Sequence, residues 1–300
     1  MVARIRCTPP TLPSSASWLL RSSNASASTI FQVNFSTSSP RLTRNRVSQW
    51  VQRQQHDPYV RARSAANSPS TSPSSSPPSA TTFVARSAFK LLELNQTWHG
   101  ERILRPGMTV ADLGAAPGGW IQAAQEVLQG QGVVVGVDLL PLQRGIGDLD
   151  GVSFLQGDFL DPVIQAKVRR ALRDATGQQH TFVDLVLSDM MANMSGSSLR
   201  DAQLSLDLSE AALLFAMQTL EPYRPPSSPS SPGLPRPRGK VVPPVQLVIK
   251  HFTSSLTPDF RNELRQRFKL VKWIKPAASR GESREGFFVC AGFRGDEFAD

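Results

Sequence analysis

The chain has 300 residues, 40% of them hydrophobic, and is long enough to bury a sizeable core. Its formal charge is +9, but the first 63 residues hold nine arginines and one acid, so the remainder is nearly neutral. Net charge therefore does not mark the body as a nucleic-acid-binding domain. Cys7 and Cys290 are the only cysteines, which excludes a disulfide framework, and no run of about 18 apolar residues is present to span a membrane.

The N-terminal residues 1–45 are rich in arginine and serine, contain no acid and carry scattered apolar residues. This composition is typical of a mitochondrial transit peptide, so we expect the mature protein in the mitochondrial matrix. A disordered basic tail that contacts RNA is the alternative. Two stretches dominated by serine and proline, 64–82 and 224–240, are expected to be tethers or insertions that do not pack.

Along the rest of the chain, short runs rich in β-branched residues alternate with helical patterns. The runs expected to be buried strands are 108–113, 132–140, 152–156, 181–189 and 245–252. The helical patterns are 120–129, 162–176, 199–220 and 258–268. Two more runs, 269–276 and 284–293, are close enough to pair as antiparallel strands. The alternation predicts an α/β fold with a doubly wound, mostly parallel sheet and an antiparallel C-terminal edge strand.

A turn of small residues follows the first predicted strand. The segment VADLGAAPGGW contains five candidate ligand-binding residues: Asp112, Gly114, Pro117, Gly118 and Gly119. Ligands of such sheets bind beside this turn, where glycine lets the backbone approach them. The spacing misses the dinucleotide fingerprint G-x-G-x-x-G, and Pro117 removes a backbone donor. The turn therefore favours a ligand less anionic than a pyrophosphate.

Acids also follow the next two predicted strands. Asp138 ends the second strand, where a carboxylate can accept both hydroxyls of a ribose. Asp158 follows the third strand, where a carboxylate can bond an adenine amino group. Each acid alone is more typical of a turn or a helix cap. The ordered series at successive strand ends predicts an adenosine moiety.

Six segments, in order, resemble those of the FtsJ-like (RrmJ-type) RNA 2′-O-ribose methyltransferases of the mitochondrial large-subunit rRNA branch: DLGAAPGGW, VDLLP, LQGDF, SDMMANMSG, VIKHF and SREGFFV. The resemblance implies a class I methyltransferase, Rossmann-like, with residues 46–300 as a single domain and 64–82 as an insertion within it. It implies S-adenosyl-L-methionine as cofactor, bound by Gly118, Trp120, Asp138, Asp158 and Asp189. It also implies methylation of a uridine in large-subunit rRNA or a pre-ribosomal particle.

The family's Lys-Asp-Lys-Glu set carries over onto Lys90, Asp189, Lys250 and Glu285. We expect Lys250 to be the general base that takes the proton from the ribose hydroxyl, and Lys90 to be a second cation that favours its neutral form. Asp189 and Glu285 would orient the two lysines. Methyl transfer is an in-line displacement that depends on alignment, and it requires no metal.

Other features have more than one interpretation. A lysine that ends a strand is usually a rim residue, and Trp120 is as typical of a core as of a cofactor contact. His99, His180 and His251 lack metal-ligand spacing and are expected at the surface or rim. The family's Ser-Asp-Met-Ala-Pro-Asn segment lacks its proline here, which predicts a looser loop after Asp189.

Contact with RNA is expected from local basic clusters. The candidates are Arg61, Arg63, Arg86, Lys90, Arg261, Arg265, Arg267, Lys269, Lys272, Lys275, Arg280 and Arg284. An RNA-binding mitochondrial ribosome assembly factor whose methyl transfer is dispensable is the main alternative function. A nicotinamide-dependent oxidoreductase is disfavoured because the fingerprint is missing. A monomer is expected, since no spare apolar stripe is present.

Overall fold

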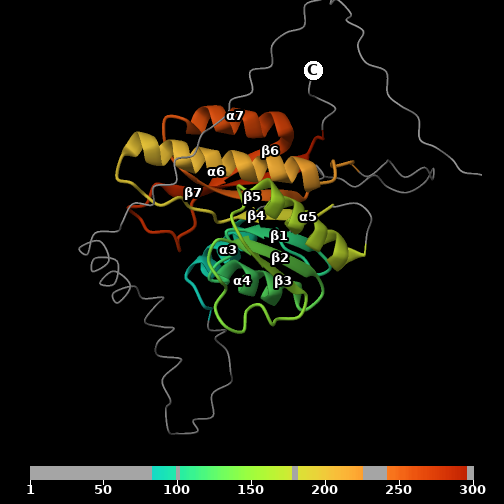
Figure 1. The fold of residues 1–300 in the computed structure, drawn as a ribbon. Coiled ribbons are helices and arrows are strands. Elements are labelled where there is room, and N and C mark those ends of the chain that lie inside the picture. Colours follow the sequence, from blue (N-terminus) through green and yellow to red (C-terminus); the bar gives the residue numbers. More distant parts are fainter. Residues whose placement is uncertain (1–82, 99–101, 178–181, 226–241, 296–300) are drawn as a thin grey trace, which may run out of the picture. The chain divides into compact units, whose positions relative to one another are not determined.

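A computed structural model of the chain describes residues 83–98, 102–177, 182–225 and 242–295, which form the coloured ribbon in Figure 1. Several predictions fall outside these residues: the leader 1–45, the insertion 64–82, most of 224–240, and Arg61, Arg63, His99 and His180. No helix in the described part combines the length and apolar character needed to cross a bilayer.

The strands form one sheet with the order β3-β2-β1-β4-β5-β7-β6. Their bounds are β1 Thr109–Leu113, β2 Val133–Asp138, β3 Val152–Gln156, β4 Leu185–Ser188, β5 Val245–Phe252, β6 Phe268–Ile274 and β7 Glu285–Phe293. Neighbouring strands are parallel except where β7 pairs with β5 and β6. The mostly parallel sheet with an antiparallel C-terminal pair is confirmed. The sequence did not predict that β7 lies between β5 and β6, which leaves β6 as the outer strand.

Helices cover both faces of the sheet (Figure 1). Their bounds are α3 Ser87–Thr97, α4 Gly119–Leu128, α5 Pro162–Thr176, α6 Ser198–Thr219 and α7 Thr257–Arg267. The first two pack into one core and the last three into another. The sequence predicted α4 to α7 to within one residue but did not predict α3. Local chemistry explains the bounds of α5, because Asp161 accepts a hydrogen bond from Val163 N (2.8 Å) and Gly177 ends it with φ of 65°.

Alternate residues of the central strands enter the two different cores, because successive side chains point to opposite faces of a sheet. In β5, Val248 packs into the core with α3 and α4, whereas Ile249 packs into the core with α6 and α7. The same alternation places Lys250 on the α3/α4 face and His251 on the α6/α7 face. Position along the strand therefore decides which of these two neighbouring polar residues faces α3 and α4.

Candidate active site

Two ion pairs form on the α3/α4 face at the carboxyl ends of the strands. Lys250 Nζ lies 2.7 Å from Asp189 Oδ1 and also donates to the main-chain oxygen of Asp189 (2.9 Å). Lys90 Nζ lies 2.6 Å from Glu285 Oε1. The four side chains are only 6–13% exposed. The structure thus brings together the four predicted catalytic residues, which come from α3, β5, β7 and the end of β4.

Glu285 links the two ion pairs electrostatically. Burial acts to raise the pKa of its carboxyl, but the adjacent Lys90 and the charge of Lys250 outweigh this effect, so the pKa lies below its ordinary value. Glu285 is therefore ionised at neutral pH. Opposite charges alternate within the cluster, and this compensates for bringing two lysines into a buried site.

The glycine turn after β1 packs tightly against its surroundings. Gly114 has φ of 85°, and a Cβ atom there would lie 2.8 Å from Met190 N; Gly118 has φ of 113°, and its Cβ would lie 2.6 Å from Ile146 Cγ2. Ala116 N donates to Asp138 Oδ2 (2.9 Å). The turn is thereby held between the end of β2 and the loop that carries Asp189.

Three carboxylates gather beside this turn. Asp112 is fully buried, and neither of its carboxylate oxygens has a hydrogen-bond partner among the described residues. Burial raises the pKa of Asp112 well above its ordinary value, and the charges of Asp189 and Asp138 raise it further. A ligand with positive charge would relieve this repulsion. The sulfonium and ammonium groups of S-adenosylmethionine fit such a site.

The two acids predicted to bind adenosine also stabilise their own turns. Asp138 Oδ1 accepts a hydrogen bond from Leu140 N (2.9 Å), so both of its carboxylate oxygens have a protein partner. Asp158, which is exposed, accepts one from Leu160 N (2.9 Å) through Oδ1. Because each carboxylate oxygen has two lone pairs, these bonds leave acceptor capacity for ligand hydroxyl or amino groups. Their cofactor-binding role stays a prediction.

The Trp120 side chain lies in the core. It is 1% exposed, its indole Nε1 donates to Ser87 O (2.8 Å), and its ring lies 5.5 Å from that of Phe287. The side chain therefore joins α4 to α3, and the cofactor-binding role of Trp120 stays a prediction. Pro117, in the same turn, accepts a hydrogen bond from Gln143 N (2.9 Å).

A buried acid that sequence reasoning missed anchors the far end of the loop after β4. Asp201 in α6 accepts hydrogen bonds from Ser195 N and Ser195 Oγ (both 2.7 Å) and from Gly196 N (3.1 Å). These bonds, with the hydroxyl contributing most, lower the pKa of Asp201. In the same loop, Met191 and Met194 are exposed. The looser loop inferred from the missing proline stays a prediction, but its end is anchored.

The prediction that His251 is a surface or rim residue was wrong. The side chain is fully buried, its ring stacks on Phe260, and its nitrogens lie 3.1 Å from Ser209 Oγ and 3.0 Å from Thr257 Oγ1. Burial lowers its pKa to about 4. The error has a simple cause: a residue next to Lys250 in a strand must face the opposite core.

Several basic residues considered for RNA contact interact within the protein. Besides Lys90, Arg86 Nε donates to Ala278 O (2.8 Å). Lys269 and Lys272 lie over the rings of Tyr223 (4.6 Å) and Trp98 (5.2 Å). Arg265, Arg280 and Arg284 are exposed.

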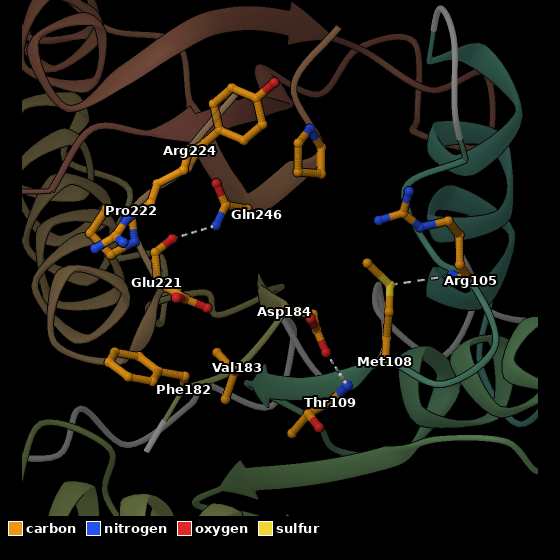
Figure 2. A pocket seen from close by; sticks show the side chains of 12 residues that line it. Arg105, Met108, Thr109, Phe182, Val183, Asp184, Glu221, Pro222, Arg224 and Gln246 are labelled. Atoms are coloured by element: carbon orange, nitrogen blue, oxygen red, sulfur yellow. Dashed lines mark hydrogen bonds between the residues drawn. The ribbon is translucent and has the colours of Figure 1, made fainter. Parts of the chain in front are cut away.

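A cavity of about 400 Å³ lies at the opposite edge of the sheet, at the amino ends of β1, β4 and β5. Figure 2 shows its polar floor, where Gln246 Nε2 donates to Glu221 O (2.9 Å) and Thr109 N donates to Asp184 Oδ2 (2.8 Å). None of the predicted site residues lines it. In doubly wound folds ligands bind at the carboxyl ends of the strands, so the ion-pair cluster is the better candidate for chemistry. In the part of the chain that the structure describes, no three His, Cys, Asp or Glu side chains form a candidate metal site.

The strand order, the glycine turn after β1 and the buried lysine–carboxylate cluster at the strand ends define a class I methyltransferase. Comparison with known families identifies the particular one. The model of the FtsJ-like methyltransferases matches residues 83–293, and the chain belongs to this family. It is an RNA methyltransferase whose methyl donor is S-adenosylmethionine.

Bacterial relatives agree with this assignment. The chain is 38% identical over 209 residues to the ribosomal RNA large subunit methyltransferase E of Alkalilimnicola ehrlichii, covering 70% of this chain and 84% of the relative. It is 40% identical over 207 residues to the protein of that name from Thiobacillus denitrificans, covering 69% and 79%. A crystal structure of a ribosomal RNA methyltransferase from Plasmodium falciparum superposes with a TM-score of 0.54 at 22% identity, covering 70% of this chain and 98% of that one, and supports the fold.

Proposed function

We propose that this protein methylates the 2′-hydroxyl of a uridine in mitochondrial large-subunit rRNA, with Lys250 as the general base. The observation that carries the proposal is the buried Lys250–Asp189 ion pair beside the unpartnered carboxylate of Asp112. A buried amine and an unpartnered carboxyl that a cation would stabilise lie at the same strand ends, which supports a site for a positively charged methyl donor. The bacterial relatives, named for large-subunit rRNA, support the choice of RNA. The composition of residues 1–45 supports a mitochondrial location.

Lys250, Asp189 and Lys90 have separate roles in the proposed reaction, and Glu285 holds Lys90 through their ion pair. A ribose hydroxyl is a poor nucleophile until its proton is removed, and Lys250 Nζ takes that proton once its amine is neutral. Asp189 holds the amine in position through its carboxylate and its main-chain oxygen. Lys90 is the second cation of the cluster, and its charge stabilises the developing alkoxide. When bound, S-adenosylmethionine supplies the methyl group on a positively charged sulfur.

Replacement of Lys250 tests the proposed base. Lys250→Arg keeps a cation beside Asp189 but cannot lose its proton at accessible pH, since a guanidinium has a pKa above about 12. The single-turnover rate of methylation is expected to fall about 10²- to 10⁴-fold. Binding of S-adenosylmethionine, measured by calorimetry, should be retained. Lys167→Arg, the same change at an exposed lysine of α5, is the matched control and should keep the wild-type rate.

The position of the methyl group is read by mapping ribose methylation on a mitochondrial large-subunit rRNA transcript and on pre-ribosomal particles. A wild-type rate in Lys250→Arg would contradict the base assignment, and a methyl group on a nucleobase would contradict the 2′-O assignment. The assembly-factor alternative predicts that cells carrying Lys250→Arg assemble normal large subunits without the methyl group. Mitochondrial import of the full chain, lost when residues 1–45 are deleted, tests the location.

A further inference from the structure

Helix α3 and its N-cap residue Arg86 present three side chains to the C-terminal part of the chain. Arg86, Lys90 and Glu93 are four and three residues apart, so they lie on one side of the helix. Arg86 Nε donates to Ala278 O (2.8 Å), and Ala278 N donates to both carboxylate oxygens of Glu93 (3.1 and 3.0 Å). Between them, Lys90 pairs with Glu285. We propose that Arg86 and Glu93 are positioning residues, which hold Lys90 in the catalytic cluster through their hydrogen bonds to the backbone of Ala278.

The segment around Ala278, from Lys275 to Glu285, is held by further hydrogen bonds. Ala278 is fully buried. Lys275 Nζ donates to Gly281 O (2.9 Å) and Ser283 O (2.7 Å), which closes the turn that leads to Glu285. At its end, Thr253 N donates to Arg284 O (2.9 Å) and ties the segment to the residue after β5. The hydrogen bonds of Arg86 and Glu93 to Ala278 therefore also set the position of Glu285 relative to α3.

The opposite attachment of α3 is to the helix that follows the glycine turn. Trp120 Nε1 donates to Ser87 O (2.8 Å), and Val84 N donates to Gln122 Oε1 (2.9 Å). These bonds lie at the amino end of α3, and its buried residues Ala88, Leu91 and Leu94 pack it into the core. The bonds of Arg86 and Glu93 to Ala278 add a direct link between α3 and the segment that leads to Glu285. The inference rests on the proposed function, because it assigns Lys90 to the reacting cluster.

The test compares Glu93→Ala with Glu126→Ala, a matched loss of one negative charge at an exposed position of α4. Glu93→Ala is expected to lower the single-turnover methylation rate about 10- to 100-fold, since small misplacements at a reacting centre have effects of this size. The affinities for RNA and S-adenosylmethionine should stay within about twofold of wild type. In a Lys90→Met background the same substitution should have no further effect on the rate, because Glu93 acts through Lys90.

A second readout does not depend on methyl transfer. The pKa of the Glu285 carboxyl, followed by carbon NMR titration, is expected to rise in Glu93→Ala because Lys90 moves away. Simple loss of the Glu93 charge acts in the opposite direction, since removing a carboxylate lowers the pKa of its neighbours. Glu93→Gln retains one oxygen acceptor, so it should fold and show a smaller shift of the same sign. Arg86→Lys keeps the charge but removes the Nε donor, and should also raise this pKa.

An unchanged or lowered pKa of Glu285 in both Glu93 variants would overturn the inference. So would a rate loss in Glu93→Ala that persists in full in the Lys90→Met background, because that pattern indicates general destabilisation. Failure of the proposed function shows differently. In that case the wild-type protein does not methylate a ribose hydroxyl, while the NMR titration still reports whether the bonds to Ala278 position Lys90 beside Glu285.

Discussion

Replacing His251 with glutamine should make the stability of the protein less dependent on pH between 7.5 and 5. The wild-type imidazole is buried between Ser209 and Thr257, and burial lowers its pKa from 6.5 to about 4. In the unfolded chain the imidazole regains its ordinary affinity for protons. Between these two pKa values the unfolded state binds more protons, so acid favours unfolding.

The size of the effect follows from the two pKa values. The stabilisation due to neutral His251 is fully present above pH 6.5 and is lost as the pH falls toward 4. Each tenfold difference in proton affinity is worth about 1.4 kcal/mol, so the whole difference amounts to about 3 kcal/mol. About 2 kcal/mol of it should be lost at pH 5. This is a large part of the 5–15 kcal/mol that typically separates folded from unfolded domains.

The assay is urea unfolding of wild type and His251→Gln at pH 7.5, 6.5, 5.5 and 5. The variant loses packing and is less stable at pH 7.5, but the difference from wild type should shrink by about 2 kcal/mol at pH 5. Phe215→Leu is the control, because it removes a ring of the same core that packs on Phe159 and leaves both His251 and the ring stacked on it in place. Its free energy of unfolding, plotted against pH, should run parallel to that of wild type. A difference in the free energy of unfolding between wild type and His251→Gln that stays constant from pH 7.5 to pH 5 would refute the reasoning.

Two further predictions concern the glycine turn. Asp112→Asn should raise the melting temperature of the cofactor-free protein at pH 7 and weaken S-adenosylmethionine binding, because it removes a buried, unpartnered carboxyl beside Asp189. Thermal melts and calorimetry measure the two effects, and a lower melting temperature of the cofactor-free variant would contradict the prediction. Gly114→Ala should reduce both the cofactor affinity and the stability, because its Cβ would clash with the Met190 backbone and its φ is 85°. Gly130→Ala is the control: Gly130 also has a positive φ, but a Cβ there would meet no atom, so this variant shows the backbone strain without the clash.

Much of the fold could be predicted because it depends on local patterns. The alternation of β-branched runs with helical patterns predicted β3 and β5 with correct bounds, and Pro162 and Gly177 mark the ends of α5 in the sequence itself. The order of strand-end residues also follows from the sequence, since parallel strands present their carboxyl ends at the same edge. This explains why Asp189 and Lys250 could be expected in one site before their distance was known.

Helix α3 shows what local patterns could not predict. It is only 11 residues long, and its apolar residues are spread around the helix rather than confined to one face, so their spacing is a weak signal; in the structure it docks to α4 and to the segment around Ala278. The pairing of Lys90 with Glu285 joins residues from the two ends of the domain. No spacing in the sequence specifies which carboxylate each lysine meets. Trp120 illustrates the same point, because a tryptophan after a glycine turn is compatible with either a cofactor contact or a core position.

The sequence by itself therefore determined the family, the alternation of elements and the residues placed at the strand ends, because these depend on neighbours along the chain. Only the tertiary structure decided that β7 lies between β5 and β6, that His251 is buried behind Lys250, and that each lysine has its own carboxylate. The physical reason is that burial and charge pairing depend on groups brought together from distant segments. The side chains of two adjacent strand residues enter different cores, and their chemistry is set there.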